Sequence, residues 1–113
     1  MAAKPAILFE EPTTVVAQMA WPTDWAALFG REAPLILEIG FGGGGFLVDL
    51  AERRPEANII GLEISRPALQ KAALKLHKRG LDHVRLVQGG GLQLLWCCFP
   101  PDSLAEIYIN FSD

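Results

Sequence analysis

The sequence predicts a doubly wound α/β fold built on one parallel sheet with the strand order 3-2-1-4. Two observations lead to this prediction. Four short apolar runs alternate with segments of helical periodicity, a pattern typical of parallel strands joined by right-handed crossovers. In addition, a glycine-rich turn directly follows the first run, and in such sheets ligands bind at the carboxyl ends of the strands.

The chain divides into an N-terminal lead-in, residues 1–34, and a domain over residues 35–113 that carries all four strands. In the lead-in, WPTDWAALFG predicts a short helix that begins after Thr23 or Asp24 and ends at Gly30. The 113 residues, 50% of them apolar, suffice for one domain but not for two. No apolar run approaches the roughly 20 residues that span a bilayer, and no signal-peptide pattern opens the chain, so we expect a cytoplasmic protein.

The first half of the domain alternates strand and helix signals in order. A strand is expected at residues 35–39, an apolar run that suits burial on both faces, and a helix at residues 44–53 that places Phe46, Leu47 and Leu50 on one face. A second strand, residues 58–64, leads into a helix with Ser65 as N-cap, Pro67 in the first turn and a stop at Gly80. The remaining elements are expected at residues 83–88 (strand), 92–98 (short helical piece) and 105–110 (strand).

The glycine turn reads EIGFGGGGF and fits two patterns. Gly40, Gly42 and Gly45 match the dinucleotide pattern G-x-G-x-x-G, whereas Gly40, Gly42 and Gly44 match G-x-G-x-G. A glycine motif alone is weak evidence for either ligand. The nearby acid Glu38 is more informative, because a carboxylate there would repel a pyrophosphate but attract the ammonium group of a methionine tail. These residues therefore favour S-adenosylmethionine over NAD.

A second acid, Glu63, ends the second strand, 25 residues after Glu38. A carboxylate at this position accepts hydrogen bonds from a ribose diol, in either an adenosine cofactor or NAD. Glu63 therefore locates the ligand without identifying it.

Four stretches together resemble one enzyme family. EIGFGGGGF, IIGLEISRPALQKA, LVQGGG and EIYINFSD look like successive motifs of the bacterial tRNA (guanine-N7-)-methyltransferases, which are class I S-adenosylmethionine-dependent enzymes with a Rossmann-like fold. The resemblance implies S-adenosylmethionine as cofactor, tRNA as substrate and Asp113 as the candidate catalytic residue. By position, the implied cofactor-binding residues are Glu38, Gly40, Gly42, Gly44, Glu63, Ile64, Gly90, Asn110 and Asp113, with Phe111 beside them.

The sequence departs from the family pattern in three places. Relatives carry Gly-Asp-Ala where this chain has Gly89, Gly90 and Gly91, so the acid expected to bind the adenine amino group is absent. The turn also has extra glycines at positions 43 and 45, which should loosen the start of the helix by up to about 1 kcal/mol each. Finally, the family's NFPDPWPK box appears here as NFSD.

The last strand has an unusual setting. EIYINF is apolar on both faces, as expected for a strand inside a sheet, yet no later segment pairs with its outer edge. We expect either a truncated form that lacks the C-terminal half or a homo-oligomer in which another copy covers this edge. Two alternatives to the enzyme stay open: a cofactor-binding or structural remnant that acts through a partner chain, and an NAD-binding half-domain.

Charge and cysteine usage add little. The formal net charge of −3 gives no support to a large nucleic-acid footprint. Lys71, Lys75 and Lys78 make one helix end basic, which is explained by the helix dipole and less readily by contact with RNA phosphate. The adjacent Cys97 and Cys98 suit neither a disulfide nor a metal site.

Overall fold

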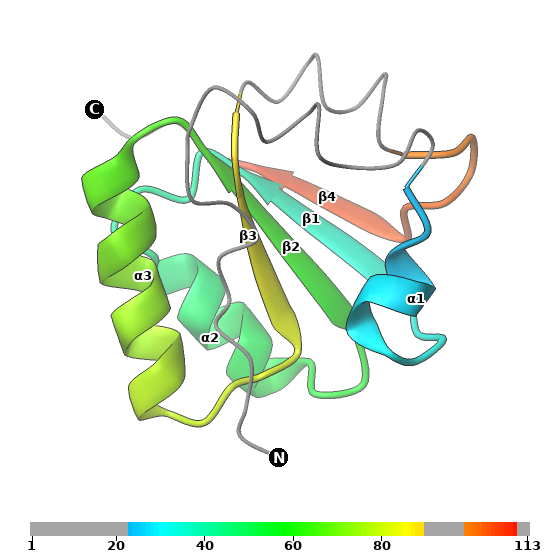
Figure 1. Ribbon diagram of the computed structural model, residues 1–113, viewed down its shortest axis with the longest axis horizontal. Helices are drawn as coiled ribbons and strands as arrows, with labels where there is room; N and C mark the ends of the chain where they lie inside the picture. Colours follow the sequence, from blue (N-terminus) through cyan, green and yellow to red (C-terminus); the bar gives the residue numbers. More distant parts are fainter. Residues whose placement is uncertain (1–22, 90–98, 111–113) are drawn as a thin grey trace.

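The computed structural model describes residues 23–89 and 99–110. These residues form a four-stranded parallel sheet of order β3-β2-β1-β4 with helices on both faces (Figure 1). The predicted fold class and strand order are confirmed, whereas the helical piece expected at residues 92–98 lies outside the described residues. The elements are α1 (Trp25–Phe29), β1 (Leu35–Ile39), α2 (Gly45–Arg53), β2 (Asn58–Glu63), α3 (Arg66–Lys78), β3 (Val84–Gln88) and β4 (Glu106–Ile109).

Local capping sets the helix ends at the predicted places. The Asp24 carboxylate caps α1 by accepting a hydrogen bond from the Ala27 N–H at 3.1 Å, and Gly30 ends the helix in the left-handed conformation with φ 80°. Ser65 caps α3 in the same way, since its hydroxyl accepts from the Ala68 N–H at 3.3 Å. Each cap satisfies a backbone N–H that has no partner inside its helix. None of the described helices is long and apolar enough to cross a membrane.

The strand register decides which side chains share a face of the sheet. Glu38 of β1 lies opposite Gly61 of β2 and Tyr108 of β4, so these three positions share one face. Helix α2 covers this face, because a Cβ on Gly61 would lie 2.9 Å from Leu47 of α2. Helix α3 follows α2 onto the same face, as expected for consecutive right-handed crossovers, and the two helices pack together.

Helix α1 covers the opposite face. The Arg31 guanidinium, just after α1, donates to Asn58 Oδ1 at 2.9 Å. The Arg85 guanidinium of β3 lies 4.9 Å from the centre of the Phe29 ring. Trp25 stacks on Phe99 at 5.2 Å between ring centres, which brings the segment before β4 to the same side. The sheet is therefore covered on both sides, as a parallel sheet requires.

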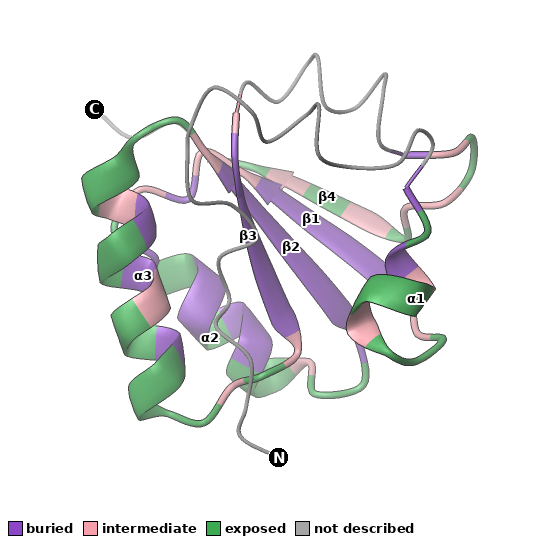
Figure 2. Cartoon of the chain, viewed as in Figure 1, coloured by how far each residue is buried: buried purple, intermediate pink, exposed green. Residues whose placement is uncertain are grey.

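Burial falls off toward β4. In Figure 2 the central strands are almost entirely buried, whereas β4 alternates between half-buried and exposed residues. Ile107 and Ile109 are 46% and 55% exposed.

The prediction of the apolar face of α2 is partly wrong. Phe46 is exposed, and its ring lies 5.3 Å from the Tyr108 ring of β4 between ring centres. The buried stripe of α2 consists of Leu47, Val48, Leu50 and Ala51.

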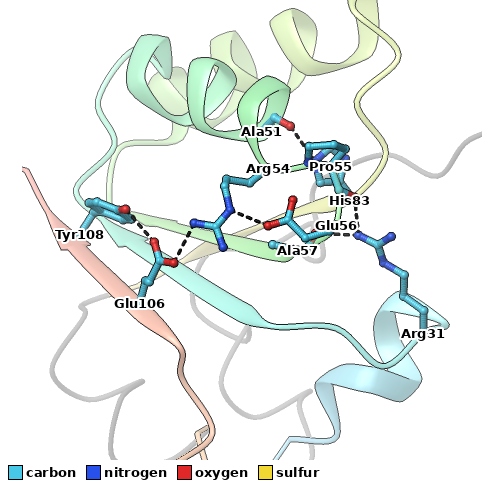
Figure 3. Close-up of polar contacts among 9 residues, drawn as sticks. All are labelled: Arg31, Ala51, Arg54, Pro55, Glu56, Ala57, His83, Glu106 and Tyr108. Atoms are coloured by element: carbon cyan, nitrogen blue, oxygen red, sulfur yellow. Dashed lines mark hydrogen bonds and ion pairs between the residues drawn. The ribbon is translucent and has the colours of Figure 1, made fainter.

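A polar network joins α2 to β4 at the amino edge of the sheet (Figure 3). Arg54, the C-cap residue of α2, donates to Glu56 Oε2 at 2.6 Å and to Glu106 Oε2 at 2.7 Å. Tyr108 donates its hydroxyl proton to Glu106 Oε1 at 2.7 Å. The hydrogen bonds from Tyr108 and from Arg54 hold the pKa of Glu106 below its usual range, so this carboxylate stays charged.

Three further hydrogen bonds, from Arg31 and His83, lie at the same end of the strands (Figure 3). Arg31 donates to the backbone carbonyls of Pro55 and Ala57 at 3.0 and 2.7 Å. The half-buried His83 ring bonds the Ala51 carbonyl at 2.8 Å. The amino edge is thus closed by charged and aromatic side chains, whereas the carboxyl edge is built mainly from backbone.

Candidate functional site

The candidate site lies at the carboxyl edge of the sheet, where residues 40–44 connect β1 to α2. Gly40, Gly42 and Gly44 all have left-handed backbone conformations, with φ of 72°, 60° and 89°. The Gly40 N–H donates to the Leu62 carbonyl at 2.8 Å, and the Gly44 N–H donates to the Phe41 carbonyl at 3.1 Å. Every second residue of the turn therefore needs a conformation that side-chain-bearing residues rarely adopt.

Two of the glycines are also required by close neighbours. A Cβ on Gly40 would lie 2.6 Å from the Asn110 backbone oxygen, and one on Gly44 would lie 2.8 Å from Ala72 Cβ of α3. By contrast, a Cβ on Gly43 would come no closer than 3.9 Å to Lys71, and one on Gly45 would meet nothing within 4 Å. The turn is thus closely packed at Gly40, against Asn110, and at Gly44, against α3. It has room at Gly43 and Gly45, the two glycines that depart from the family pattern.

Glu63 organises the turn from the neighbouring strand. Its Oε1 accepts from the Gly42 N–H at 2.8 Å, and its Oε2 accepts from the Ile64 and Ser65 N–H groups, both at 3.0 Å. A carboxylate has about four lone-pair positions, so three backbone donors leave capacity for one more. Glu63 is half-buried and can meet a ligand while its orientation is fixed by backbone groups.

Glu38 lies deeper than the sequence suggests. The side chain is 0% exposed, and its Oε2 accepts from Asn110 Nδ2 at 2.7 Å. The other oxygen, Oε1, is buried and has no hydrogen-bond partner among the described residues. Burial raises the pKa of Glu38 from 4.5 to about 7, an effect that the Asn110 hydrogen bond opposes and the nearby Glu63 charge reinforces. Glu38 is therefore a buried acid that exchanges its proton near neutral pH, two residues before the first glycine of the turn.

Asn110 ties the end of β4 to this turn in three ways. Its N–H donates to the Ile39 carbonyl at 3.1 Å, its own carbonyl packs against Gly40, and its side chain orients Glu38. Asn110, which the resemblance implies as a cofactor-binding residue, therefore also holds the Glu38 carboxyl group in place.

Two contacts at the site were not predicted from the sequence. Gln88, the last residue of β3, donates from Nε2 to the Ile64 carbonyl at 2.7 Å. Lys75 of α3 donates from Nζ to the Gly43 carbonyl at 2.9 Å, so this lysine anchors the turn. The only sequence signal for the first contact is a polar residue that ends an apolar strand, and for the second a lysine in a helix that follows the turn.

Several expected site residues lie outside the described part of the chain. These are Gly90, Phe111 and Asp113. The residues that the structure does bring together at the carboxyl edge are Glu38, Gly40, Gly42, Gly44, Glu63, Ile64 and Asn110. The described residues contain no group of three or more His, Cys, Asp or Glu side chains that could hold a metal ion.

A hollow of about 430 Å³ lies at the opposite edge of the sheet. Leu35 and Asn58, the first residues of β1 and β2, line it together with Trp25, Glu32 and Pro100. Ligands of doubly wound sheets bind at the carboxyl ends of the strands. This hollow is therefore separate from the site at the glycine turn.

Comparison with known proteins identifies a methyltransferase family. Residues 32–113 match a family model described as "Putative methyltransferase". The chain is 43% identical over 91 residues to the tRNA (guanine-N(7)-)-methyltransferase of Thermotoga maritima, an alignment that covers 80% of this chain and 29% of that protein. It is also 43% identical over 90 residues to the enzyme of the same name from Methylococcus capsulatus, covering 80% and 39%. The chain thus spans well under half the length of these relatives.

Solved structures share the fold. The O-methyltransferase TomG from Streptomyces achromogenes, determined in complex with SAM, matches with a TM-score of 0.61 and 26% identity over 77% of this chain and 41% of that chain. The YcgJ protein from Bacillus subtilis matches with a TM-score of 0.58 over 79% of this chain and 40% of that chain at 24% identity, which supports the fold alone. The fold is the Rossmann-like fold of class I methyltransferases. Because the family model covers most of the sequence, the chain belongs to this methyltransferase family.

Proposed function

We propose that the chain binds S-adenosylmethionine at the carboxyl edge of the sheet and serves in methyl transfer to N7 of a guanine in tRNA. One observation carries the proposal: Glu38, two residues before Gly40, is a fully buried carboxyl group with one oxygen lacking a partner among the described residues. The relatives with about 40% identity, all tRNA (guanine-N(7)-)-methyltransferases, support the choice of reaction and substrate.

The residues present fit the proposed cofactor. The Glu38 carboxylate provides negative charge for the ammonium group of the methionine tail, and binding of that cation would favour the ionised form of Glu38. Glu63 has one free acceptor position for a ribose hydroxyl, and exposed Ile64 offers an apolar surface to the adenine ring. The side-chain-free surface at Gly40 and Gly42 lets the ligand approach the backbone.

An NAD-binding role is less consistent with the same geometry. A dinucleotide places its pyrophosphate at the start of the helix that follows the glycine turn. In this chain the Gly42 N–H of that turn is already bonded by the Glu63 carboxylate, whose charge also acts on the nearby Glu38. Among the described residues, the Lys75 ammonium group bonds the Gly43 carbonyl instead of facing a ligand phosphate. Two acids near a pyrophosphate are unfavourable, so we retain S-adenosylmethionine.

The proposed reaction depends on alignment. When bound, the cofactor supplies an electrophilic sulfonium methyl group, and guanine N7 has a lone pair and no proton to lose, so no strong general base is needed. The residues of this chain would fix the cofactor's tail and ribose, while Asp113, the sequence-based candidate beyond the end of β4, would stabilise the positive charge that develops on the guanine ring. Asn110 would hold Glu38 at the correct depth for the tail.

The test is transfer of a tritiated methyl group from S-adenosylmethionine to an unmodified tRNA transcript by the 113-residue chain, followed by strand cleavage at N7-methylguanosine. We expect incorporation at one guanine and at least a tenfold loss on Glu38→Gln or Glu63→Gln. Glu56→Gln is the matched control, because Glu56 is exposed at the opposite edge and should leave transfer unchanged. Binding of cofactor without transfer would contradict the enzymatic role and favour a binding module that acts through a partner chain.

We also propose two properties of the whole protein that the resemblance suggests: residues 35–113 act as the cofactor-binding domain, and the protein works in the cytoplasm, where tRNA is modified.

We propose further that the protein forms a homo-oligomer that covers the outer edge of β4. The exposed Ile107 and Ile109 on this strand support the proposal. Sedimentation velocity should then show concentration-dependent association that is lost in the Ile107→Lys, Ile109→Lys double variant. Leu74→Lys, on the exposed side of α3, should leave association unchanged, and a wild-type chain that stays monomeric would exclude the oligomer.

A further inference from the structure

Among the described residues at the carboxyl ends of the strands, Gln88 is a polar residue to which the proposed function gives no role. It ends β3, and the strand register places it directly beside Glu63 of β2. The Gly89 N–H donates to the Glu63 carbonyl at 3.2 Å, so the two strands stay paired up to this point. The Gln88 side chain reaches past this last pair to the Ile64 carbonyl, which brings its amide group to the edge where the site lies.

The orientation of the amide is fixed by its partner. A carbonyl oxygen only accepts hydrogen bonds, so the Gln88 NH₂ group must face Ile64 and the amide oxygen must face away from it. The side chain is 8% exposed, and its Oε1 has no hydrogen-bond partner among the described residues. A buried amide oxygen without a donor is unfavourable compared with an apolar side chain of the same size. A glutamine here therefore needs a donor that the described protein residues do not supply.

The surroundings narrow the chemistry of that donor. On one side lies Glu63, whose carboxylate has room for a ribose hydroxyl, and next to it lies Ile64, which is 70% exposed and apolar. A ligand with its ribose at Glu63 and a flat apolar ring against Ile64 presents the edge of that ring to β3. Gly90, which follows β3 closely, has no side chain with which to accept a hydrogen bond.

We propose that the amide oxygen of Gln88 accepts a hydrogen bond from the 6-amino group of the bound adenine ring. This proposal rests on the proposed function and extends it, because it makes Gln88 the residue that distinguishes a 6-amino purine from a 6-oxo purine. The Ile64 carbonyl, by holding the NH₂ group of Gln88, keeps the acceptor oxygen turned toward the ligand. A 6-oxo purine offers an acceptor at the same place, which the amide oxygen would repel.

The experiment is calorimetric titration of the 113-residue chain with two ligands, S-adenosylhomocysteine and its 6-oxo analogue S-inosylhomocysteine. We expect the wild-type chain to bind the 6-amino ligand about tenfold more tightly. Gln88→Met keeps the length of the side chain but removes the acceptor, so the preference should fall to within about twofold. Gln88→Glu keeps an acceptor oxygen and should keep the preference, even if both ligands bind more weakly because the donor to Ile64 is lost.

Gln70→Met is the matched control, because Gln70 is exposed on α3 and the same chemical change there should leave both affinities unchanged. Equal affinity of the wild-type chain for the two ligands overturns the proposal without any variant, so a Gln88→Met chain that fails to fold does not protect it. A full preference retained in folded Gln88→Met overturns it as well. Failure of the wild-type chain to bind either ligand would instead contradict the proposed cofactor site itself, and the role of Gln88 would fall with it.

Discussion

At the scale of single residues, the four consecutive glycines from Gly42 to Gly45 have different reasons to be glycine. Gly42 and Gly44 have left-handed backbone conformations, and Gly44 also touches α3 through Ala72. Gly43 and Gly45 have ordinary surroundings with room for a side chain. Backbone conformation and packing within the protein therefore explain Gly42 and Gly44. The approach of a ligand is needed only to explain Gly43 and Gly45.

This difference predicts opposite effects of the same substitution. Gly44→Ala should destabilise the fold by about 2–4 kcal/mol, because it combines a left-handed alanine with a Cβ 2.8 Å from Ala72 Cβ. Gly45→Ala, the matched control in the next position, should stabilise it by up to about 1 kcal/mol, because it removes a helical glycine without any clash. Urea unfolding measures both values, and equal effects at the two positions would contradict this account.

Glu38 predicts an unusual dependence of stability on pH. Its pKa is raised by burial from 4.5 to about 7, so the folded state binds a proton more tightly than the unfolded state. The corresponding stability is fully present below about pH 4.5 and is lost as the pH rises through about 7. The free energy of unfolding should therefore fall by on the order of 3 kcal/mol across this window.

The comparison that isolates this effect is with Glu38→Gln, which resembles the protonated acid and can still accept from Asn110. Urea unfolding at pH 5 and at pH 8, chosen as about the two ends of the window, should show that wild type loses stability relative to the variant. All other titratable groups are common to the two chains, so the difference between them isolates Glu38. A difference that does not change with pH would show that Glu38 is ionised when buried.

At the scale of secondary structure, local signals predicted almost every boundary. Strand β1 has the predicted bounds, and β2, β3 and β4 differ from prediction by one residue at one or both ends, because runs of apolar residues and caps such as Asp24 and Ser65 are local features. Phe46 was misplaced because helical periodicity identifies an apolar face without showing where the sheet ends. Helix α2 extends over the edge strand, where Phe46 meets Tyr108 instead of the core.

The site was predicted only in part, for a related reason. Glu38, Glu63 and the glycine turn could be identified because each ends or follows a strand on the ligand side of the sheet. The bonds from Asn110 to Glu38 and from Gln88 to Ile64 join residues 72 and 24 positions apart, and only the strand order and register bring them together. The depth of Glu38 likewise depends on the neighbouring strands, so the sequence indicated its charge but not its burial.

The loops of the amino edge allow a prediction at this scale, because two arginines hold the connection between α2 and β2 in different ways. Arg31 bonds the buried Asn58 side chain and two backbone carbonyls, so Arg31→Met should destabilise the fold by about 1–3 kcal/mol through unpaired buried acceptors. Arg54 pairs with Glu56 and Glu106 in a solvent-accessible network. Arg54→Met, the control, should have a smaller effect that disappears in molar salt, because exposed ion pairs are weak and screened. Thermal unfolding of both variants at low and high salt measures the contrast, and an Arg54 effect as large as that of Arg31 would contradict it.

At the scale of the whole molecule, the two ends of the strands are built differently. At the amino ends of the strands, the side chains of Arg31, Arg54 and Glu106 join neighbouring segments (Figure 3). At the carboxyl ends, Glu63 bonds the backbone of the glycine turn. Glu38 Oε1 and Gln88 Oε1 have no hydrogen-bond partner among the described residues. Acceptor oxygens without a partner among the described residues therefore lie at the carboxyl ends of the strands, where ligands of doubly wound α/β sheets bind.

The measurement that tests this account most directly is calorimetric titration of the folded 113-residue chain with S-adenosylhomocysteine, with NAD as the control ligand. We expect one-to-one binding of S-adenosylhomocysteine and no heat with NAD, because Glu38 favours an ammonium group and disfavours a pyrophosphate. Absence of heat with S-adenosylhomocysteine from a chain shown to be folded, or equal binding of NAD, would contradict it.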